Sequence, residues 1–487
     1  MLRLSSLVLL SFSLAAATAD ARQRDPEPPV VSPDLKRLSI EELAELDVTS
    51  VSRRVERLSQ TAAAVTVIRQ EDIRRSGVTS IADAMRLADS LDVARSGARN
   101  WSISARGFTI GTANKLLVLM DGRTLYSPLF AGTFWDVQDT VLADITRIEV
   151  VRGPGGTIWG ANAVNGVINI ITRDASETRG NVATLVAGTE NQLVTAARHG
   201  GRLAGGAGNY RVYGKFRRLG PNVFASGESA RDPMALGQFG VRLDSEVERT
   251  SRWSLQGNVY RGNEGVFERD DTEVRGGFVS GLWTRRLSPG AEFQARAYYD
   301  HTHRTVPLQF DEGRHTAAVD VQHGVALGTR HNLIAGGEVR VSTARDVGSS
   351  TLLFDPERRT NTVGGIFVQD EIAVTPALFV TLGSKFERND YTGFEVQPTV
   401  RLRWSRGDRQ TVWGAVSRAV RLPTRLDTDL RILPGPTSQT EIRGNENFRA
   451  ESAVAYESGI ECGRTRASPW TSRRSSTDTT TCAARSL

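Results

Sequence analysis

Hydrophobic and polar residues alternate along most of the chain after about residue 178. Apolar side chains take every second position there, and polar side chains, often Arg, take the positions between them. The clearest stretches are 210–217, 253–260, 293–300 and 400–405. A period of two predicts β-strands with one apolar and one polar face. The strands are expected to be about ten residues long, which is enough to cross a bilayer when tilted.

The polar face distinguishes two kinds of sheet. A soluble β-sandwich shows the same alternation on shorter strands. A dry core holding this many unpaired Arg side chains would be prohibitively costly, so the pattern favours a transmembrane antiparallel β-barrel with a wide, wet lumen. No stretch offers 18 consecutive apolar residues and the mean hydropathy is −0.29, which excludes a membrane protein built from helices.

Residues 52–175 have a mixed pattern that predicts a separate α+β domain. Apolar or alternating runs predict strands at 64–68, 103–106, 116–120, 145–151 and 167–172. Helical spacing predicts helices at 70–75 and 80–88. Asp121-Gly122 follows a buried run directly and predicts a tight turn. The fold class is therefore mostly β, with an N-terminal α+β domain ahead of a barrel.

The N-terminus has the pattern of a secretory signal. Arg3 is followed by an apolar run over 7–17, and Ala17 and Ala19 form a small-x-small cleavage site, so we expect residues 1–19 to be removed. A membrane anchor is the alternative, but the run is too short to span a bilayer. Residues 20–51 form a polar, proline-containing leader, with a helix-start pattern at Ser39 and Glu42.

Charge and cysteine content add little to this picture. The net charge is +6, but the basic residues are scattered and only four are Lys, so we expect no nucleic-acid partner. The two cysteines, Cys462 and Cys482, do not have the spacing of a zinc site. They lie in an unusual tail, which argues against a structural disulfide. We expect no metal and no cofactor.

Several motifs, in order, resemble TonB-dependent outer-membrane receptors. The most specific is RGPGGTIWGANAVNGVINIIT at 152–172, which is similar to the end of that family's plug domain. SARGF, LLVLMDGR and ITRIEVVRGP precede it in the family's order. FVQDEIAVTPALFVTLGSKFE, GAVSRAVRLPT and NFRAESAVAYESGI resemble segments of its barrel. The resemblance covers residues 46 to about 460 and divides the chain into a plug at 52–175 and a partial barrel at 176–460.

The resemblance implies a plug inside a 22-stranded barrel. It implies active uptake of a scarce solute across the outer membrane of a Gram-negative bacterium, driven by the inner-membrane TonB protein complex. The solute class it favours is a ferric siderophore, a small metal chelate, with cobalamin, haem or carbohydrate as alternatives. The protein would be a monomer surrounded by outer-membrane lipid, and it would not be an enzyme.

Residues 46–51 are the candidate TonB box. The segment contains β-branched residues that suit an added strand, and it lies between the leader and the plug. Its members are Leu46, Asp47, Val48, Thr49, Ser50 and Val51. Six residues of this kind occur often, so position along the chain carries most of this interpretation.

Two further groups in the plug have predicted roles. Glu149, Arg152 and Arg173 are candidates for polar contacts with the barrel, and ordinary solvated surface is the equal alternative. The glycine-rich turn is expected to be structural, because no Gly-Lys-Ser/Thr follows to make a phosphate loop. Its residues are Gly153, Pro154, Gly155 and Gly156.

Solute contacts are predicted from family position and aromatic content. The candidates are Asn100, Trp101, Tyr126, Phe130 and Trp135. Packing of the aromatic residues of 126–135 in the plug core is the favoured alternative. His301 and His303 share one strand face, but two histidines without a third ligand make a weak metal site, so we expect a strand end or loop there.

The C-terminal part departs from the family. About 280 residues, up to residue 460, follow the plug before the alternating pattern fails, enough for about twelve to fourteen strands. The alternation stops at 461, and 16 of the last 27 residues are Ser, Thr or Arg. We hypothesise that residues 461–487 arise from a frameshift or truncated gene model, because open barrel edges are not tolerated in lipid. A non-functional truncated receptor is therefore an alternative.

Three other functions are alternatives to uptake. A signalling receptor of this fold would need an extra domain ahead of the box, and the leader is too short for one. A passive porin would not carry a domain of this size before its strands. No convergent catalytic motif points to an enzyme.

Overall fold

The computed structural model describes residues 46–107, 115–247, 250–406, 410–434 and 440–462. The chain divides into two units, 1–39 and 40–487, and every described residue belongs to the second. The predicted signal at 1–19, the helix-start pattern at Ser39 and Glu42 and nearly all of the tail at 461–487 lie outside the described residues. Among the described residues, no helix is long and apolar enough to cross a membrane.

The predicted plug, residues 52–175, contains a five-stranded sheet with the strand order β3-β8-β9-β6-β7. Only the β6–β9 pair is parallel among these neighbours. The strands are β3 (Ala64–Arg69), β6 (Leu116–Met120), β7 (Arg123–Thr124), β8 (Ile145–Arg152) and β9 (Gly166–Thr172). Two two-stranded pairs accompany it: β1 (Asp47–Val48) with β2 (Glu56–Arg57), and β4 (Asp92–Ser96) with β5 (Asn100–Ser104). Four of the five predicted strands are confirmed. The fifth, predicted at 103–106, is instead β5 at Asn100–Ser104, because Arg106 and Gly107 adopt positive φ and end the strand.

Short helices complete the plug. They are α2 (Gln70–Ser76), α3 (Ile81–Ala84) and α4 (Gly156–Trp159), with 3₁₀ turns at Leu58–Gln60, Met85–Leu87, Leu142–Asp144 and Ala175–Thr178. The helix α2 ends at Gly77, whose φ of 74° is the left-handed conformation that glycine adopts without strain. The hydroxyl of Ser80 accepts the backbone N–H of Asp83 and so caps α3. The helix predicted over 80–88 is therefore an α-helical turn continued by a 3₁₀ turn.

The main core of the plug lies between its sheet and these helices. Ile148, Ile168 and Ile170 from the sheet and Ile81 and Met85 from the helical segment are all fully buried there. Burial of side chains this large stabilises a fold by about 1.5–3 kcal/mol each. The core is almost wholly aliphatic.

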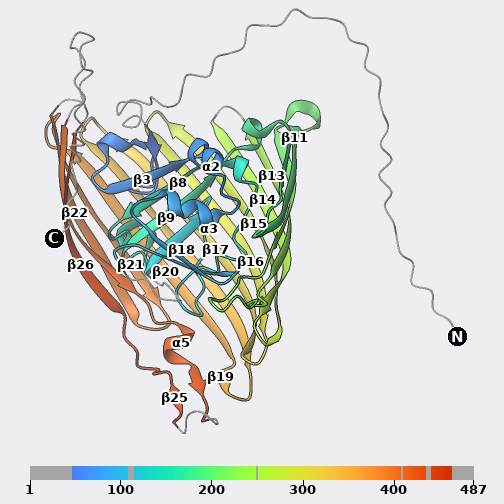
Figure 1. Ribbon diagram of the computed structural model, residues 1–487. Coiled ribbons are helices and arrows are strands. Elements are labelled where there is room, and N and C mark those ends of the chain that lie inside the picture. Colours follow the sequence, from blue (N-terminus) through green and yellow to red (C-terminus); the bar gives the residue numbers. More distant parts are fainter. Residues whose placement is uncertain (1–45, 108–114, 248–249, 407–409, 435–439, 463–487) are drawn as a thin grey trace, which may run out of the picture. The chain divides into compact units, whose positions relative to one another are not determined.

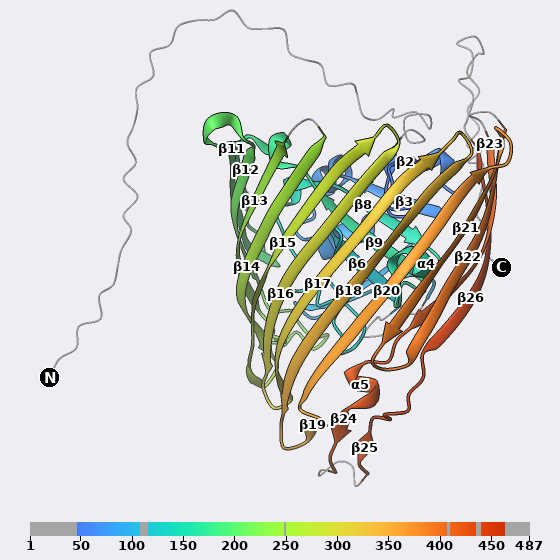
Figure 2. The ribbon, with the colours of Figure 1, turned by 180° about the vertical axis from the view of Figure 1, so that it is seen from behind.

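A second sheet of 14 antiparallel strands, called the wall below, follows the plug (Figures 1 and 2). Its strands are β10 (Gly180–Val186), β11 (Asn191–Arg202), β12 (Asn209–Leu219), β13 (Met234–Val247), β14 (Ser251–Val266), β15 (Arg269–Ser288), β16 (Ala291–Val306), β17 (Phe310–Leu327), β18 (His331–Gly348), β20 (Arg358–Ala373), β21 (Leu378–Asn389), β22 (Gly393–Arg406), β23 (Gln410–Arg421) and β26 (Glu451–Cys462). The number agrees with the twelve to fourteen predicted from chain length. In the described residues β10 and β26 are the two edges and do not pair with each other.

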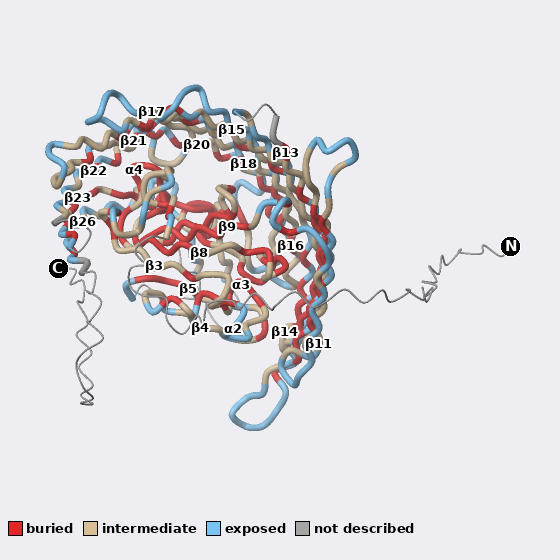
Figure 3. The backbone as a smooth tube through the Cα atoms, turned by 90° about the horizontal axis from the view of Figure 1, so that it is seen from above, coloured by how far each residue is buried: buried red, intermediate tan, exposed pale blue. Residues whose placement is uncertain are grey.

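The wall curves around the plug, whose buried strands lie on its concave side (Figure 3). The predicted alternation is confirmed: in β12, Arg211, Lys215 and Arg217 are buried towards the plug. The opposite face carries exposed apolar residues, such as Val400 and Leu402 of β22. A water-facing sheet would hide that apolar row, whereas lipid accepts it.

The two ends of the wall differ. At one end, called the turn end, connections are short, as at 289–290 and 328–330. At the other, the loop end, connections span 220–233, 349–357 and 422–450. The loop end also carries a small sheet of β19 (Leu352–Phe354), β24 (Leu430–Ile432) and β25 (Ile442–Arg443), next to helix α5 (Arg425–Thr428). If this sheet is an outer-membrane barrel, as the sequence predicts, the longer connections of the loop end would face the cell exterior.

Candidate functional site

The candidate box at 46–51 is folded into the plug. Asp47 and Val48 form β1 and pair with Arg57 and Glu56 of β2, and the N–H of Leu58 donates to the carbonyl of Leu46 at 2.8 Å. Val48 is completely buried. Because only two residue pairs hold β1, this strand is a small element that another strand could replace.

Glu149 attaches the box to the centre of the plug sheet. Its carboxylate is fully buried on β8 and accepts the backbone N–H groups of Thr49 (3.0 Å) and Ser50 (2.8 Å) and the hydroxyl of Ser50 (2.5 Å). Arg147 also donates to it at 2.7 Å, and the indole N–H of Trp159 donates to the carbonyl of Ser50 at 2.7 Å. Hydrogen bonds to a buried charge are among the stronger ones in proteins. A force on the box therefore reaches β8 directly.

Two arginines after the box reach the wall. Arg53 makes an ion pair of 2.7 Å with Asp320 of β17 and lies over the ring of Trp159 at 4.4 Å. The guanidinium of Arg54 donates to the carbonyl of Leu333 in β18. The segment that follows the box thus touches both the plug and the wall.

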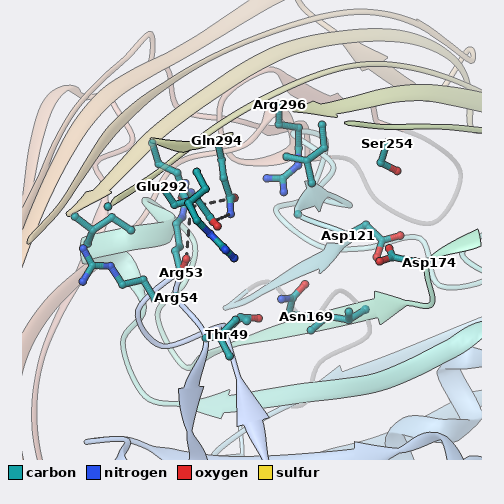
Figure 4. A pocket seen from close by; sticks show the side chains of 18 of the residues that line it. Thr49, Arg53, Arg54, Asp121, Asn169, Asp174, Ser254, Glu292, Gln294 and Arg296 are labelled. Atoms are coloured by element: carbon teal, nitrogen blue, oxygen red, sulfur yellow. Dashed lines mark hydrogen bonds between the residues drawn. The ribbon is translucent and has the colours of Figure 1, made fainter. Parts of the chain in front are cut away.

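A polar cavity of about 570 Å³ lies beside this segment at the turn end. Thr49, Arg53 and Arg54 line it from the N-terminal side, and the wall contributes Ser254, Glu292, Gln294 and Arg296 (Figure 4). The plug side is formed by Asp121, Asn169 and Asp174. Such a lining solvates a polar molecule without burying bare charge.

Three carboxylates in one stretch of the plug bind the inner face of the wall. They are called the boundary carboxylates below. Asp139 lies 2.7 Å from the ammonium of Lys215 and 3.3 Å from the guanidinium of Arg217. Asp144 lies between Arg198 (3.2 Å) and Arg211 (3.5 Å), and Asp136 pairs with Arg304. The three are almost completely buried.

The pKa values of two boundary carboxylates move in opposite directions. Burial raises the pKa of Asp144, although Arg211 and Arg198 favour its charged form. Burial also opposes the charge on Asp136, but the guanidinium of Arg304 outweighs it and lowers the pKa of Asp136. The cationic partners therefore stabilise the charged form of Asp136 more strongly, relative to the cost of burial, than that of Asp144.

Glu56, beside the box in β2, has a pKa raised to about 7 by burial, and the nearby charge of Glu371 contributes in the same direction. Its partner across the strand pair is Val48. Ionisation of Glu56 near neutral pH would thus act next to the box.

An aromatic cluster covers the loop end of the plug. Phe130 packs edge-on to Phe134 at 4.9 Å and lies with Phe354 and Leu426 from the connections of the wall. Phe130 is thus placed where the plug meets the loop end. Tyr126 packs instead against a second apolar cluster of the plug that contains Leu117 and Val167. Burial raises the pKa of Tyr126 to about 12, and Arg340 lies 5.6 Å from its ring.

The other predicted solute contacts are placed differently. Trp135 is buried in the main core of the plug and offers no surface to a solute. For this residue the structure agrees with the alternative of packing in the plug core. Trp101 of β5 partly packs against the same core, between Arg86 and Arg95, whose guanidinium groups lie 5.5 and 5.4 Å from its ring. Asn100 begins the same strand and is exposed.

Of the three predicted plug–barrel contacts, Glu149 does not bind the wall, whereas Arg152 and Arg173 lie near it. The hydrogen bonds of Glu149 go to the box and Arg147, and not to the wall. Burial lowers the pKa of Arg152, the like charge of Arg106 lowers it further, and the carboxylate of Glu457 in β26 opposes this shift. Arg173 meets the wall through its carbonyl, which accepts from Arg211 at 2.8 Å.

The glycine-rich turn also approaches the wall. Gly153 has a φ of 95°, and a side chain there would meet the carboxylate of Glu457. A side chain at Gly156 would meet the amide of Gln397. Close approach to the wall, in addition to the turn itself, accounts for glycine at these positions. Pro154 and Gly155 complete the turn that leads into α4.

Sequence reasoning missed the boundary carboxylates. Their signal is the segment DVQDTVLAD at 136–144, in which acidic residues recur inside an otherwise apolar stretch. A buried carboxylate needs a cationic partner, and the inward Arg and Lys of the wall were already recognised. His301 and His303 lie on the outward face of β16, and no group of three or more potential metal ligands occurs among the described residues.

Comparison with known proteins identifies the two domains. Residues 57–167 match the family model of the TonB-dependent receptor plug domain, and residues 174–480 match that of the TonB-dependent receptor-like β-barrel. The second match alone covers more than half of the chain.

Individual relatives are more distant. The vitamin B12 transporter BtuB of Vibrio vulnificus is 32% identical over 33% of this chain and 27% of its own length. The ferric enterobactin receptor of Pseudomonas aeruginosa is 25% identical over 87% of this chain and 68% of its own. The crystal structure of the siderophore receptor PirA from Pseudomonas aeruginosa superposes with a TM-score of 0.63 at 20% identity, covering 83% of this chain and 73% of that one. The chain spans two thirds or less of the length of several such relatives. With both family models matched in order and the plug lying inside the wall, this chain belongs to the TonB-dependent receptor family.

Proposed function

We propose that this protein is a TonB-dependent receptor of a Gram-negative outer membrane that takes up a ferric siderophore. The observation that carries the proposal is the attachment of the box to the plug through the buried carboxylate of Glu149. An energy source acting on residues 46–51 would act on the plug sheet through these bonds. The exposed apolar face of the wall supports placement in lipid.

The proposed partner is the inner-membrane TonB protein. The outer membrane has neither a nucleotide supply nor an ion gradient of its own, so work must arrive through a mechanical connection. A strand of the partner would replace β2 and pair with the backbone of the box. Main-chain hydrogen bonds would carry the force, so side-chain identity in the box would matter less than free N–H groups.

Pulling would first disturb the contacts nearest the box. Arg53 would leave Asp320 and Arg54 would leave the carbonyl of Leu333, which would enlarge the cavity at the turn end. Water can replace the polar bonds between plug and wall, so the plug can shift without exposing a large apolar surface. The cavity would then be the exit space of the solute.

The solute class rests on the named relatives and on the loop end. Two relatives that match over 87% and 83% of this chain are named as ferric enterobactin receptors. Phe130 lies at the loop end of the plug, and Tyr126, Asn100 and Trp101 stay candidates by prediction. Cobalamin is the second candidate, because a vitamin B12 transporter is 32% identical over 33% of this chain.

The test is uptake in a host that lacks its own receptors. Cells expressing this chain receive labelled ferric enterobactin or labelled cobalamin, with the native box, with Val48→Pro or with Val48→Ala. Proline removes a backbone donor, so Val48→Pro should abolish uptake while solute binding persists. Val48→Ala keeps the N–H and should retain uptake.

Each outcome leads to a different conclusion. Equal uptake by the proline variant would mean that the box is elsewhere or that transport is passive. Uptake of cobalamin alone would replace the siderophore assignment. Binding without uptake in every version would reject active transport by this chain.

A further inference from the structure

The outward face of the wall has an apolar hollow over four strands. It has a volume of about 520 Å³ and lies over β15, β16, β17 and β18, which are adjacent in the sheet (Figure 2). Gly281, Ala297 and Ala317 line it with small or absent side chains, and Val279 and Val339 are larger residues at its sides. The lining is overwhelmingly apolar. A hydrocarbon chain fits such a hollow, whereas a polar solute does not.

A row of polar residues borders the hollow on its loop-end side. His301 of β16 lies directly opposite His315 of β17, and their rings stack at 4.5 Å. The hydroxyl of Tyr299, which lines the hollow, lies 2.6 Å from Nδ1 of His315. Thr343 of β18 continues this row beside His315. Towards the loop end, the outward surface thus changes from apolar residues to hydrogen-bonding residues from one row to the next.

The next row towards the loop end is strongly basic. Strand register places Arg261 opposite Arg275, and Arg345 opposite Arg358. Between the two arginine pairs lie His303 and Gly313. With strands about 4.8 Å apart, Arg275 and Arg345 are separated by about 14 Å. All four arginines are exposed.

Like charges directly opposite each other in a sheet repel, so the two arginine pairs need an anion or solvent between them. Neighbouring acidic side chains supply only part of the negative charge that these arginines need. Arg345 pairs with Glu357 at 2.6 Å, and His303 lies 3.2 Å from Asp311. Glu273 lies in the row beyond, opposite Thr305. Among the described residues, Arg261, Arg275 and Arg358 have no ion pair with a carboxylate.

We propose that this surface binds a lipid of the outer leaflet that carries phosphate on its headgroup. One acyl chain would lie in the hollow over Ala297 and Ala317. The phosphate would sit on the basic row at Arg261 and Arg275, with further oxygens reaching His303 and Arg345 across the gap at Gly313. Guanidinium groups match phosphate in both charge and geometry. The position fits the outer-membrane placement proposed above, because the basic row follows the apolar hollow on its loop-end side, as a headgroup follows an acyl chain.

The test measures lipid bound to the purified chain in detergent by native mass spectrometry. The probe is diphosphoryl lipid A, compared with the same lipid after removal of its phosphates and with inorganic phosphate alone. The intact protein should bind the phosphorylated lipid at least tenfold more tightly than either comparison. Arg261→Gln with Arg275→Gln should weaken binding about 25-fold, from about fivefold per arginine at a lipid surface.

The matched control is Arg285→Gln with Arg388→Gln, two exposed arginines of the wall away from the basic row. This pair should leave binding unchanged. Ala317→Phe fills the hollow and should weaken the lipid but not inorganic phosphate. Hydrogen exchange of the wall strands verifies that each variant folds.

Three results would overturn the proposal. The first is equal binding of the dephosphorylated lipid, which needs no variant and so is independent of folding. The second is inorganic phosphate binding as tightly as the lipid, which would leave the hollow without a role. The third is an equal loss in the control pair. None depends on uptake, so the lipid site and the transport function can fail separately.

Discussion

The core of the plug and its boundary with the wall are both buried, yet they are built from opposite kinds of residue. The core brings together Ile148, Ile168 and Ile170, with almost no polar group. At the boundary, Asp139 and Asp144 meet Lys215 and Arg211. An apolar core loses its stabilisation when it opens, whereas charges can exchange their partners for water. The plug can therefore stay folded while it moves against the wall.

The largest expected effect comes from breaking one boundary pair. Asp139→Ala leaves Lys215 and Arg217 buried without a counter-charge, which should lower the free energy of local unfolding by about 3–5 kcal/mol. Hydrogen exchange of β12 in the whole chain measures it. Adding Lys215→Met and Arg217→Met should restore most of the loss. If the single change is neutral, the boundary is already hydrated and the contrast with the core is weaker than we infer.

The second largest effect is expected from a substitution in the core of the plug. Ile170→Ala removes a fully buried side chain and should destabilise the plug by about 2–5 kcal/mol, because the cavity left behind cannot collapse completely. Ile171→Ala, on the opposite face of β9 and only partly buried, is the control and should cost less. Exchange of the β8 and β9 amides reports both. Equal losses would mean that the two faces of the sheet are packed alike.

The bond between box and plug should give a smaller effect. Glu149→Gln removes the charge that Thr49 and Ser50 bind, and should weaken the attachment by about 1.5–3 kcal/mol. A spin label at position 46 should become more mobile. Glu71→Gln, which changes a carboxylate on α2 that pairs with Arg74 and Arg75, should leave the label unchanged. If the label is no more mobile in Glu149→Gln than in the unchanged protein, Glu149 does not attach the box to β8.

The smallest effect is a pH dependence beside the box. The pKa of Glu56 is raised from 4.5 to about 7, so the folded pair β1–β2 prefers the protonated form. Its contribution to stability is fully present below about pH 4.5 and is lost as the pH rises through about 7. The label at position 46 should therefore gain mobility between pH 5 and pH 8, and Glu56→Gln should flatten the curve. A curve that persists in that variant would assign the titration to another group.

Local patterns predicted much of this fold because they depend on neighbouring residues alone. The alternation in 210–217 required only the period of a strand, and Asp121-Gly122 required only a turn that accepts positive φ; both residues have it, at 49° and 76°. Glu149 shows where such reasoning stops. Its place in β8 was predicted, but its partners at Thr49 and Ser50 lie 100 and 99 residues away along the chain.

The sequence by itself determined the class of fold, the order of plug and wall, and which wall residues face inward. It left open what those residues meet. Asp136 and Arg304 lie 168 residues apart, and no local pattern joins them. The tertiary structure decided these pairs, together with the cavity beside the box and the outward row of arginines. The physical reason is that the face of a side chain follows from the backbone period, whereas its partner depends on the register and curvature of strands that are distant in sequence.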